Sequence, residues 1–316
     1  MCGILGVIGR CEEGALKLAE KKISARGRDD FISLSKPSYR FSQSRLALTN
    51  INTPPKLEID GLILLFNGEI YNYKELLEEF GKDSGDERLA IITAYRRFGL
   101  EFVHRLEGMF AIAIYDPLQE KLILARDRFG KKPLFYAKLG ESFYFASSIS
   151  ALLPFLGKNS LNKEAMIDYL ALLAPCQDRS FYEGIKKLEA SCMGVFENSV
   201  LKIRRYYSPL KETFSLRKED ALKNIEALLS KSVKKRVANE VGSALLLSSR
   251  IDSTLMATFS DIPTLSIGYE GFEKYDESKE ARIGAELLCR ENRSFIFGRD
   301  RFFSGLDEIV EILDEP

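Results

Sequence analysis

The sequence has a single histidine, no net charge and no long apolar run. Lys and Arg together number 46, as do Asp and Glu, so no global field attracts nucleic acid or an anionic membrane. No apolar run approaches the length that spans a bilayer, and no basic segment precedes the apolar stretch at the N-terminus. We therefore expect a soluble, cytoplasmic protein without nucleic-acid or membrane partners, acting on a small neutral or zwitterionic substrate.

Paired cysteines are also lacking. The five cysteines are odd in number and scattered, and no two of them form a C-x-x-C motif. This pattern argues against a disulfide framework and against a zinc site, so we expect no metal site. The cysteines are Cys2, Cys11, Cys176, Cys192 and Cys289.

The only histidine, His104, lies among apolar residues at helical spacing, which predicts a structural role. A hydrolase with a Cys-His or Ser-His-Asp arrangement would have to use this residue as its base. Nothing around His104 resembles a catalytic loop. Any cysteine chemistry in this chain therefore needs a base from elsewhere.

The first half of the chain reads as short strands interrupted by helical periodicity. Several strands are apolar enough to be buried on both faces, so we expect antiparallel sheets layered with helices. Helices are expected at residues 13–21 and 73–98, the second with a break at 81–85. The expected strands are residues 4–8, 45–49, 62–68, 109–116, 121–127 and 143–148.

Helical spacing dominates after Asn162, at residues 162–173 and 216–239, which predicts a mostly helical connector. A strand, turn, helix and strand follow, the opening of a parallel α/β sheet. Only two or three such units are present, fewer than a nucleotide-binding sheet normally has. We place the boundary near 208–214. The expected late elements are strands 243–249, 264–270 and 293–298 and helices 251–259, 277–289 and 306–316.

Cys2 directly follows the initiator methionine, and removal of Met1 would leave an α-amine and a thiol on one residue. Such an amine can act as general base for its own side chain. Its pKa is roughly 7.7 to 8.0, so a useful fraction is free base at cellular pH. The alternative is that Cys2 is a small buried residue at the start of a strand.

Six segments of the first half are MCGILGVIG, RGRDD, SRLALTN, FNGEIYNYKEL, EGMFAIAIYD and RDRFGKKPLFY. In their order and spacing they resemble class II glutamine amidotransferases, and within that group glutamine-dependent asparagine synthetases. The similarity continues through DYLALLAP, FYEGIKKL, RYYSP, SALLLSSRIDS, TLSIGYE and KYDES, and so covers the whole chain. It implies a glutaminase domain at residues 2–205, a four-layer αββα sandwich of antiparallel sheets. Residues 216–316 would form an incomplete α/β, asparagine-synthetase-like ATP-binding domain with a parallel sheet.

The resemblance makes Cys2 the nucleophile that attacks the glutamine side-chain amide, forms a thioester and releases ammonia. The Asn67 amide and the Gly68 backbone N–H would stabilise the oxyanion that forms on the carbonyl oxygen. Arg45 would pair with the substrate α-carboxylate, for which a guanidinium fork is suited. Glu69 would help to hold the α-ammonium group.

A second acid is expected on the α-ammonium group, from the turn in SGDERLAII. Counting back from Tyr95 without a gap puts Glu87 in register, whereas a turn slipped by one residue would use Asp86. Both remain candidates, with a preference for Glu87. Two further departures, Arg28 in RGRDD and Ser148 in FASSIS, do not touch the nucleophile.

The family implies ATP and Mg²⁺ in the second half, where a Ser-Gly-Gly-x-Asp-Ser loop cups pyrophosphate with its backbone N–H groups. Ser249 and Arg250 replace both glycines here. If those positions need φ > 0, side chains strain them, and Arg250 occupies phosphate space unless it binds phosphate itself. The residues in register with nucleotide contacts are Leu247, Ser248, Ser249, Arg250, Asp252, Ser253, Ile267 and Gly268. For Leu247, Ser253, Ile267 and Gly268 the alternative is that they are core residues only.

The segment LDEIVEILDEP resembles a point midway through the synthetase domain, so we expect further phosphate and metal contacts to be missing. Three functions remain open. The first is an ATP-dependent ligase that passes ammonia from glutamine to aspartate, in a family that permits a homodimer. The second is a glutaminase joined to a non-functional synthetase remnant, and the third is a non-enzymatic interaction protein.

Overall fold

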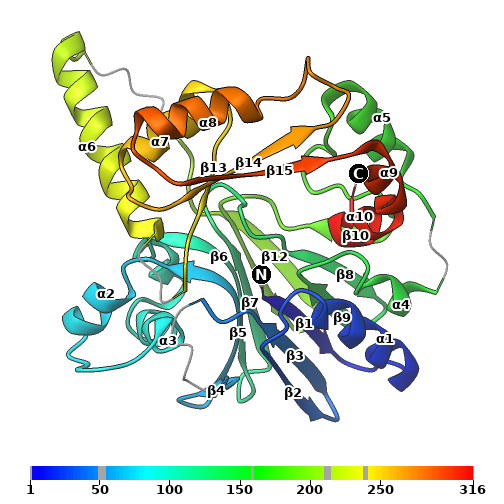
Figure 1. Cartoon of the computed structure of the whole chain (residues 1–316). Helices are drawn as coiled ribbons and strands as arrows, with labels where there is room; N and C mark the ends of the chain where they lie inside the picture. The colour runs from blue at the N-terminus through cyan, green and yellow to red at the C-terminus, as the bar shows by residue number, and fades with distance from the viewer. Residues whose placement is uncertain (1, 49–54, 158–159, 210–214, 238–240, 316) are drawn as a thin grey trace. The chain divides into compact units, whose positions relative to one another are not determined.

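The computed structural model describes residues 2–48, 55–157, 160–209, 215–237 and 241–315. The chain divides into two units, one formed by residues up to 209 and the other by residues 215–314 (Figure 1). Within the described residues, no helix combines the length and the apolar composition that a membrane crossing requires.

In the described part of the first unit, the strands form two antiparallel sheets of six strands each. The first sheet contains β1 (Gly3–Ile8), β2 (Asp30–Lys36), β3 (Tyr39–Arg45), β8 (Phe135–Leu139), β9 (Ser142–Ala146) and β10 (Ile185–Lys187), in the spatial order β10-β8-β9-β1-β3-β2. The second contains β4 (Glu58–Ile59), β5 (Leu62–Ile70), β6 (Gly108–Asp116), β7 (Lys121–Arg126), β11 (Cys192–Glu197) and β12 (Val200–Arg205), in the order β12-β11-β7-β6-β5-β4.

Side-chain alternation along β1 separates two of the layers. Leu5 and Val7 pack with the buried face of α1 (Glu13–Ser24), whereas Ile4 packs in the layer between the two sheets. Successive side chains of a strand point to opposite faces, so one strand serves two cores. The first sheet is thus covered by α1 and by the short helix α4 (Leu153–Leu156) on its outer face.

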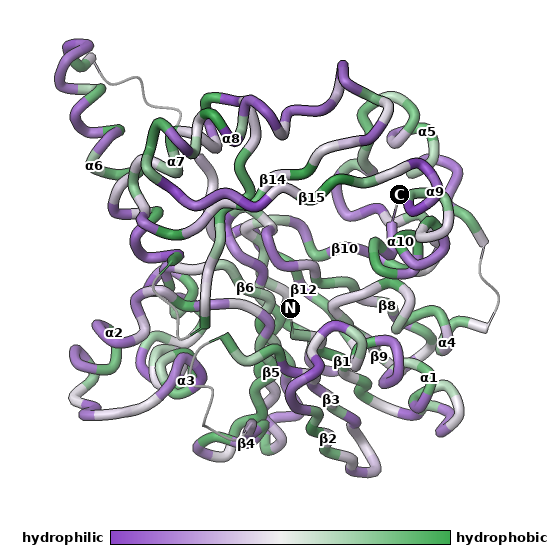
Figure 2. Tube along the Cα trace, in the orientation of Figure 1, coloured by the Kyte–Doolittle hydropathy of each residue, from purple (hydrophilic) through white to green (hydrophobic). Residues whose placement is uncertain are grey.

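The second sheet repeats this arrangement through β5. Leu62 and Leu64 pack with α2 (Tyr73–Glu79) and α3 (Glu87–Phe98), whereas the intervening residues face the first sheet. Figure 2 shows β5 as predominantly hydrophobic, as expected of a strand buried on both faces. The layer order is helices, sheet, sheet, helices, which confirms the predicted four-layer αββα sandwich.

One predicted strand, residues 45–49, is wrong. The preceding strand β3 pairs with β1 and ends at Arg45, and Thr49 and Asn50 lie outside the described residues. After Arg45 the backbone bonds to side chains: the Leu46 carbonyl accepts from Cys2 Sγ, and the Ala47 N–H donates to Asp29. These side-chain partners take the place of a strand ladder.

The predicted mostly helical connector is also wrong. After α5 (Lys163–Leu172) the chain returns to the sheets as β10, β11 and β12. β11 pairs with β7 on one side and β12 on the other, so strands distant in sequence supply its hydrogen-bond partners. The boundary predicted at 208–214 falls mostly on residues that lie outside the described ranges.

The second unit contains a parallel sheet, as predicted. The described strands have the order β13-β14-β15, with a small buried cluster of Leu247, Ala257, Ala281 and Ala285. Figure 2 shows α6 as mainly hydrophilic, and no described residue of that helix is buried. The elements are α6 (Lys218–Val237), β13 (Leu245–Leu246), α7 (Ile251–Thr258), β14 (Thr264–Tyr269), α8 (Ser278–Leu287), β15 (Asn292–Phe297), α9 (Arg299–Ser304) and α10 (Leu306–Leu313).

A side chain also links the two sheets of the first unit. Gln43 on β3 is buried, and its Oε1 accepts the backbone N–H of Phe66 on β5 at 3.0 Å. The neighbouring strand β4 pairs only with Leu62 and Ile63. The Gln43 side chain therefore satisfies a backbone donor of β5 that lies beyond the end of β4.

We expect Gln43→Met to lower the free energy of unfolding by about 1–3 kcal/mol, because methionine keeps the volume but leaves the buried Phe66 N–H without its acceptor. Urea denaturation measures this change. The exposed Gln119 provides a matched control, and Gln119→Met should leave stability nearly unchanged. Equal effects of the two substitutions would contradict a specific bond between the sheets.

Candidate active site

Cys2 lies at the entrance to β1, where it is partly buried. Its Sγ donates to the Leu46 carbonyl at 3.8 Å, and Arg26 Nε donates to the Cys2 carbonyl at 3.5 Å. If the strand alternation continues, Cys2 shares the face of Ile4, which packs in the layer between the sheets. The thiol is thus held where that layer ends.

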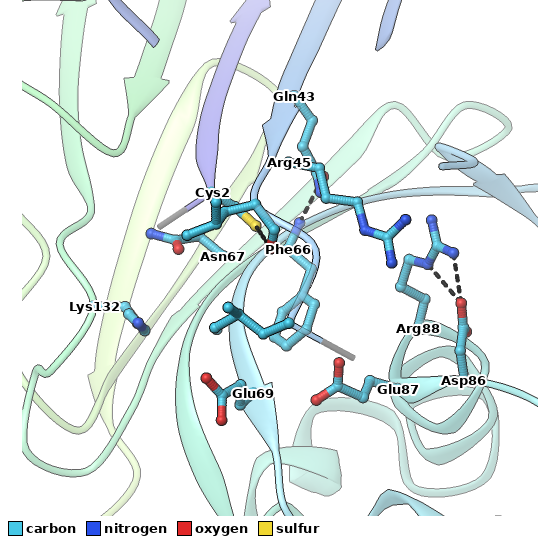
Figure 3. Close-up of a pocket in the computed structure, with 13 residues that line it drawn as sticks. Cys2, Gln43, Arg45, Phe66, Asn67, Glu69, Asp86, Glu87, Arg88 and Lys132 are labelled. Atoms are coloured by element: carbon cyan, nitrogen blue, oxygen red, sulfur yellow. Dashed lines mark hydrogen bonds and ion pairs between the residues drawn. The ribbon is translucent and has the colours of Figure 1, made fainter. Parts of the chain in front are cut away.

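The end of β5 lies beside this thiol (Figure 3). Asn67 and Glu69 follow Leu65 by two and four residues on β5, so their side chains point to the same face as Leu65, toward the first sheet. Asn67 is only 1% exposed, and its Nδ2 has no hydrogen-bond partner among the described residues. A buried amide donor without a protein partner is unusual, and it can donate to a water or to a ligand in the cavity.

Gly68 lies between these two side chains, close to β6. A Cβ on Gly68 would overlap the Met109 carbonyl oxygen and lie 2.8 Å from Phe110 Cα. Only glycine lets β5 and β6 approach this closely. The close approach thereby sets the position of the backbone at the end of β5.

Around these residues lies a cavity of about 100 Å³ within the first unit. Three of the lining side chains are cationic, and three are carboxylates. In Figure 3 the guanidinium groups of Arg45 and Arg88 lie on one side, and the carboxylates of Glu69 and Glu87 lie across from them. A zwitterion matches this distribution of charge. The lining residues are Cys2, Gln43, Arg45, Leu46, Leu48, Phe66, Asn67, Gly68, Glu69, Asp86, Glu87, Arg88 and Lys132.

Asp86 and Glu87 differ in their partners. Asp86 caps α3, because its Oδ1 accepts the Leu89 N–H at 3.0 Å, and its Oδ2 accepts from Arg88 Nη2 at 2.6 Å and Nε at 2.8 Å. Glu87 is buried, and its Oε1 accepts the Ile70 N–H at 2.7 Å. Both oxygens of Asp86 are therefore engaged within the protein.

Arg45 has its own carboxylate partner, since its Nη1 lies 3.4 Å from Asp30 Oδ2.

The seven first-unit site residues predicted from sequence all line this one cavity. Sequence reasoning missed Gln43, Arg88 and Lys132, which also line it. Lys132 lies in the segment RDRFGKKPLFY, whose resemblance to the family was the available signal. Gln43 directly precedes SRLALTN, and Arg88 lies in SGDERLAII, but neither carried a signal of its own.

The described residues that line the cavity do not include His104. This histidine ends the 3₁₀ helix η1 (Gly99–His104) and is exposed. Its Nε2 lies 3.2 Å from Glu101 Oε2, and its ring meets that of Tyr206 edge-on at 5.7 Å between centroids. These contacts are those of a surface residue.

In the second unit, the loop that replaces the glycine-rich phosphate loop joins β13 to α7. Neither Ser249 nor Arg250 has a positive φ, and Arg250, at −90°, occupies the N-cap of α7. The condition for backbone strain in this loop is therefore not met. The loop closes on itself, because Ser248 Oγ and Ser253 Oγ lie 2.9 Å apart and the Ser248 N–H donates to Ser253 Oγ at 3.1 Å.

A carboxylate also engages this loop. The Ser249 N–H donates to Glu277 Oε2 at 3.3 Å, and Arg250 Nε lies 3.6 Å from Glu277 Oε1. Asp252 is exposed in the first turn of α7. Of the four residues whose alternative role is in the core, Leu247, Ser253 and Gly268 are buried, but Ile267 is 41% exposed because its side chain lies on the open face of β14.

Two models of known protein families match the chain. Residues 1–207 match the model of the glutamine amidotransferase domain, and residues 224–316 match that of asparagine synthase. Putative asparagine synthetase (glutamine-hydrolyzing) 2 of Methanocaldococcus jannaschii is 30% identical over the whole chain, which covers 68% of that relative. Asparagine synthetase (glutamine-hydrolyzing) 1 of Bacillus subtilis is 27% identical over the whole chain, which spans 53% of its length.

Among solved structures, similarity is more distant. Glutamine phosphoribosylpyrophosphate amidotransferase from B. subtilis is 17% identical, with a TM-score of 0.48. That match covers 93% of this chain and 65% of the other.

We expect Gly68→Ala to lower the free energy of unfolding by about 1–3 kcal/mol, as overpacking does, because the new methyl group overlaps the β6 backbone. Chemical denaturation measures the loss. Gly14 in α1 is a matched control with open space around it, and Gly14→Ala should change stability by no more than about 1 kcal/mol. A Gly68→Ala variant as stable as the Gly14→Ala variant would mean that β5 moves freely at this point.

Proposed function

Because the chain belongs to the family of glutamine-hydrolysing asparagine synthetases, with a glutamine amidotransferase domain in residues 1–207, we propose that it hydrolyses glutamine at the cavity around Cys2. One observation carries this proposal. The Cys2 thiol shares its cavity with the buried Asn67 amide, whose Nδ2 has no partner among the described residues, and with charges that suit both ends of an amino acid.

The reaction begins at Cys2. Once Met1 is removed, the α-amine takes the thiol proton, and the sulfur attacks the carbonyl carbon of the substrate side-chain amide. Negative charge then develops on the carbonyl oxygen, to which Asn67 Nδ2 and the Gly68 N–H donate. The amide nitrogen takes up the proton and leaves as ammonia. Water hydrolyses the resulting thioester to glutamate and restores the thiol.

Recognition of the substrate uses the two sides of the cavity. Arg45 binds the α-carboxylate, because a guanidinium fork matches the two carboxylate oxygens. Glu69 and Glu87 hold the α-ammonium group. We prefer Glu87 over Asp86, because counting back from Tyr95 without a gap places Glu87 in register with the acid of the family.

For the second half we propose a partial ATP-binding domain at residues 216–316, following a glutaminase domain at 2–205. In the family, ammonia is passed to aspartate with the use of ATP and Mg²⁺. The loop present here does not fit pyrophosphate, because Glu277 engages both the Ser249 N–H and the Arg250 guanidinium. A carboxylate at this position also repels phosphate oxygens. The proposed compartment is the cytoplasm.

We expect Cys2→Ala to abolish glutaminase activity without loss of fold, since nucleophile and base reside on one residue. Glutamate release measures the activity, circular dichroism the fold, and intact mass the absence of Met1. His104→Gln is the matched control and should keep its rate, whereas removal of a general base costs roughly 10²–10⁴-fold. Residual hydrolysis by Cys2→Ala, or full activity with Met1 retained, would contradict this mechanism.

We expect the unmodified chain to bind ATP weakly and Ser249→Gly/Arg250→Gly to bind it better, because the double substitution removes the Arg250 side chain from the space for phosphate and lets the backbone approach the phosphate more closely. Calorimetric titration with ATP and magnesium measures both. Arg282→Ala, which removes an exposed pair with Glu286, serves as control. Micromolar ATP binding by the unmodified chain, with conversion of aspartate to asparagine, would identify Arg250 as a phosphate ligand instead.

A further inference from the structure

Lys132 is a buried cation in the wall of the cavity. Lys132 is only 8% exposed, and it lines the cavity together with Cys2, Asn67 and Glu69. Figure 3 shows the Lys132 ammonium directed into the cavity, on the side of Cys2, Asn67 and Glu69. None of the roles assigned above to cavity residues involves this side chain.

The loop that carries Lys132 is ordered from within. Asp127 is buried and accepts the backbone N–H groups of Phe129, Lys131 and Lys132 at 3.0–3.1 Å. Arg126 Nε donates to the Lys132 carbonyl at 2.8 Å, and its Nη2 donates to the Gly130 carbonyl at 2.7 Å. Gly130, with φ of +63°, permits the turn. The backbone of Lys132 is thus bonded on both its N–H and its carbonyl, which determines where the side chain enters the cavity.

Burying this cation is unfavourable in the resting protein. Desolvation is the largest influence on the pKa of Lys132 and lowers it, opposed by the charges of Glu69, Cys2 and Asp127, while Arg26 acts in the same direction as burial. Removing a charge from water costs free energy unless a nearby opposite charge compensates it. The cost is offset if an anion forms beside the ammonium during turnover.

We propose that Lys132 is a further catalytic residue, whose ammonium stabilises the thiolate of Cys2 in the hydrolysis of glutamine. This inference rests on the proposed function, since it assigns a role at the same nucleophile. Lys132 keeps its proton throughout: the proton of the thiol goes to the α-amine of Cys2, and the Lys132 ammonium supplies only positive charge. Asn67 and Gly68 serve the oxyanion, so the two anions of the cycle have separate partners.

Alkylation of Cys2 by iodoacetamide tests this role without requiring turnover, with the N-terminal peptide followed by mass spectrometry. Lys132→Met keeps the length of the side chain and removes its charge. We expect its alkylation rate at pH 7 to fall about tenfold, because the thiolate is the reactive form and loses its neighbouring cation. Lys132→Arg should retain most of the rate. The exposed neighbour Lys131 is the matched control, and Lys131→Met should react like the unmodified chain.

Glutamine hydrolysis gives the second measurement. For Lys132→Met we expect kcat to fall about tenfold with KM within about twofold, the pattern of a group that acts on the reacting atoms. The melting temperature should not fall, because the substitution removes a desolvated cation. A lower melting temperature with unchanged alkylation would show a structural role and overturn the proposal.

Two more outcomes separate the alternatives. If Lys132→Met raises KM for L-glutamine but not for its α-amide, Lys132 binds the substrate α-carboxylate, and the proposal is wrong. If the unmodified chain does not hydrolyse glutamine, yet Lys132→Met still slows alkylation of Cys2, the proposed function fails while the role of Lys132 stands.

Discussion

The face-to-face packing of two antiparallel sheets is the constraint on which the rest of the first unit depends. Every second residue of β1 and β5 must face the layer between the sheets, and in the core those residues include Ile4, Ile63 and Leu65. Where the layer ends, the same alternation presents Cys2 and Asn67. The site is therefore a continuation of the core, and it inherits the order of strands that are buried on both faces.

This origin explains why polar groups in the cavity are buried more deeply than folding alone would favour. Gln43 and Glu87 are satisfied by backbone N–H groups of β5. Asn67 Nδ2 is a buried donor without an acceptor in the described part of the chain, and Lys132 is a cation that is only 8% exposed. A desolvated donor lowers the stability of the fold, but it interacts more strongly with negative charge that develops in the cavity during a reaction. The arrangement favours a transient anion over the resting state.

The second unit shows the opposite balance. Its buried cluster is small, and its loop at Ser248 to Ser253 is satisfied internally, by the pair of serines and by Glu277. A loop whose donors already have acceptors offers little to an incoming anion. The two units thus differ in what they leave for a ligand: the first retains donors, and the loop of the second has closed on itself.

The sequence by itself determined the strands that carry continuous apolar residues, the α3 helix, the four-layer class and seven of the cavity residues, because these are local patterns or family motifs. Tertiary structure alone decided the rest. The end of β3 depends on Cys2 and Asp29, and β11 exists because β7 and β12 supply its partners. Gln43 is held at the cavity by its side-chain bond to Phe66 on the other sheet. The backbone of Lys132 is positioned by Arg126 and Asp127, side chains that the fold buries. Hydrogen-bond partners that are distant in sequence cannot be inferred from periodicity, which records only the side chains of a single segment.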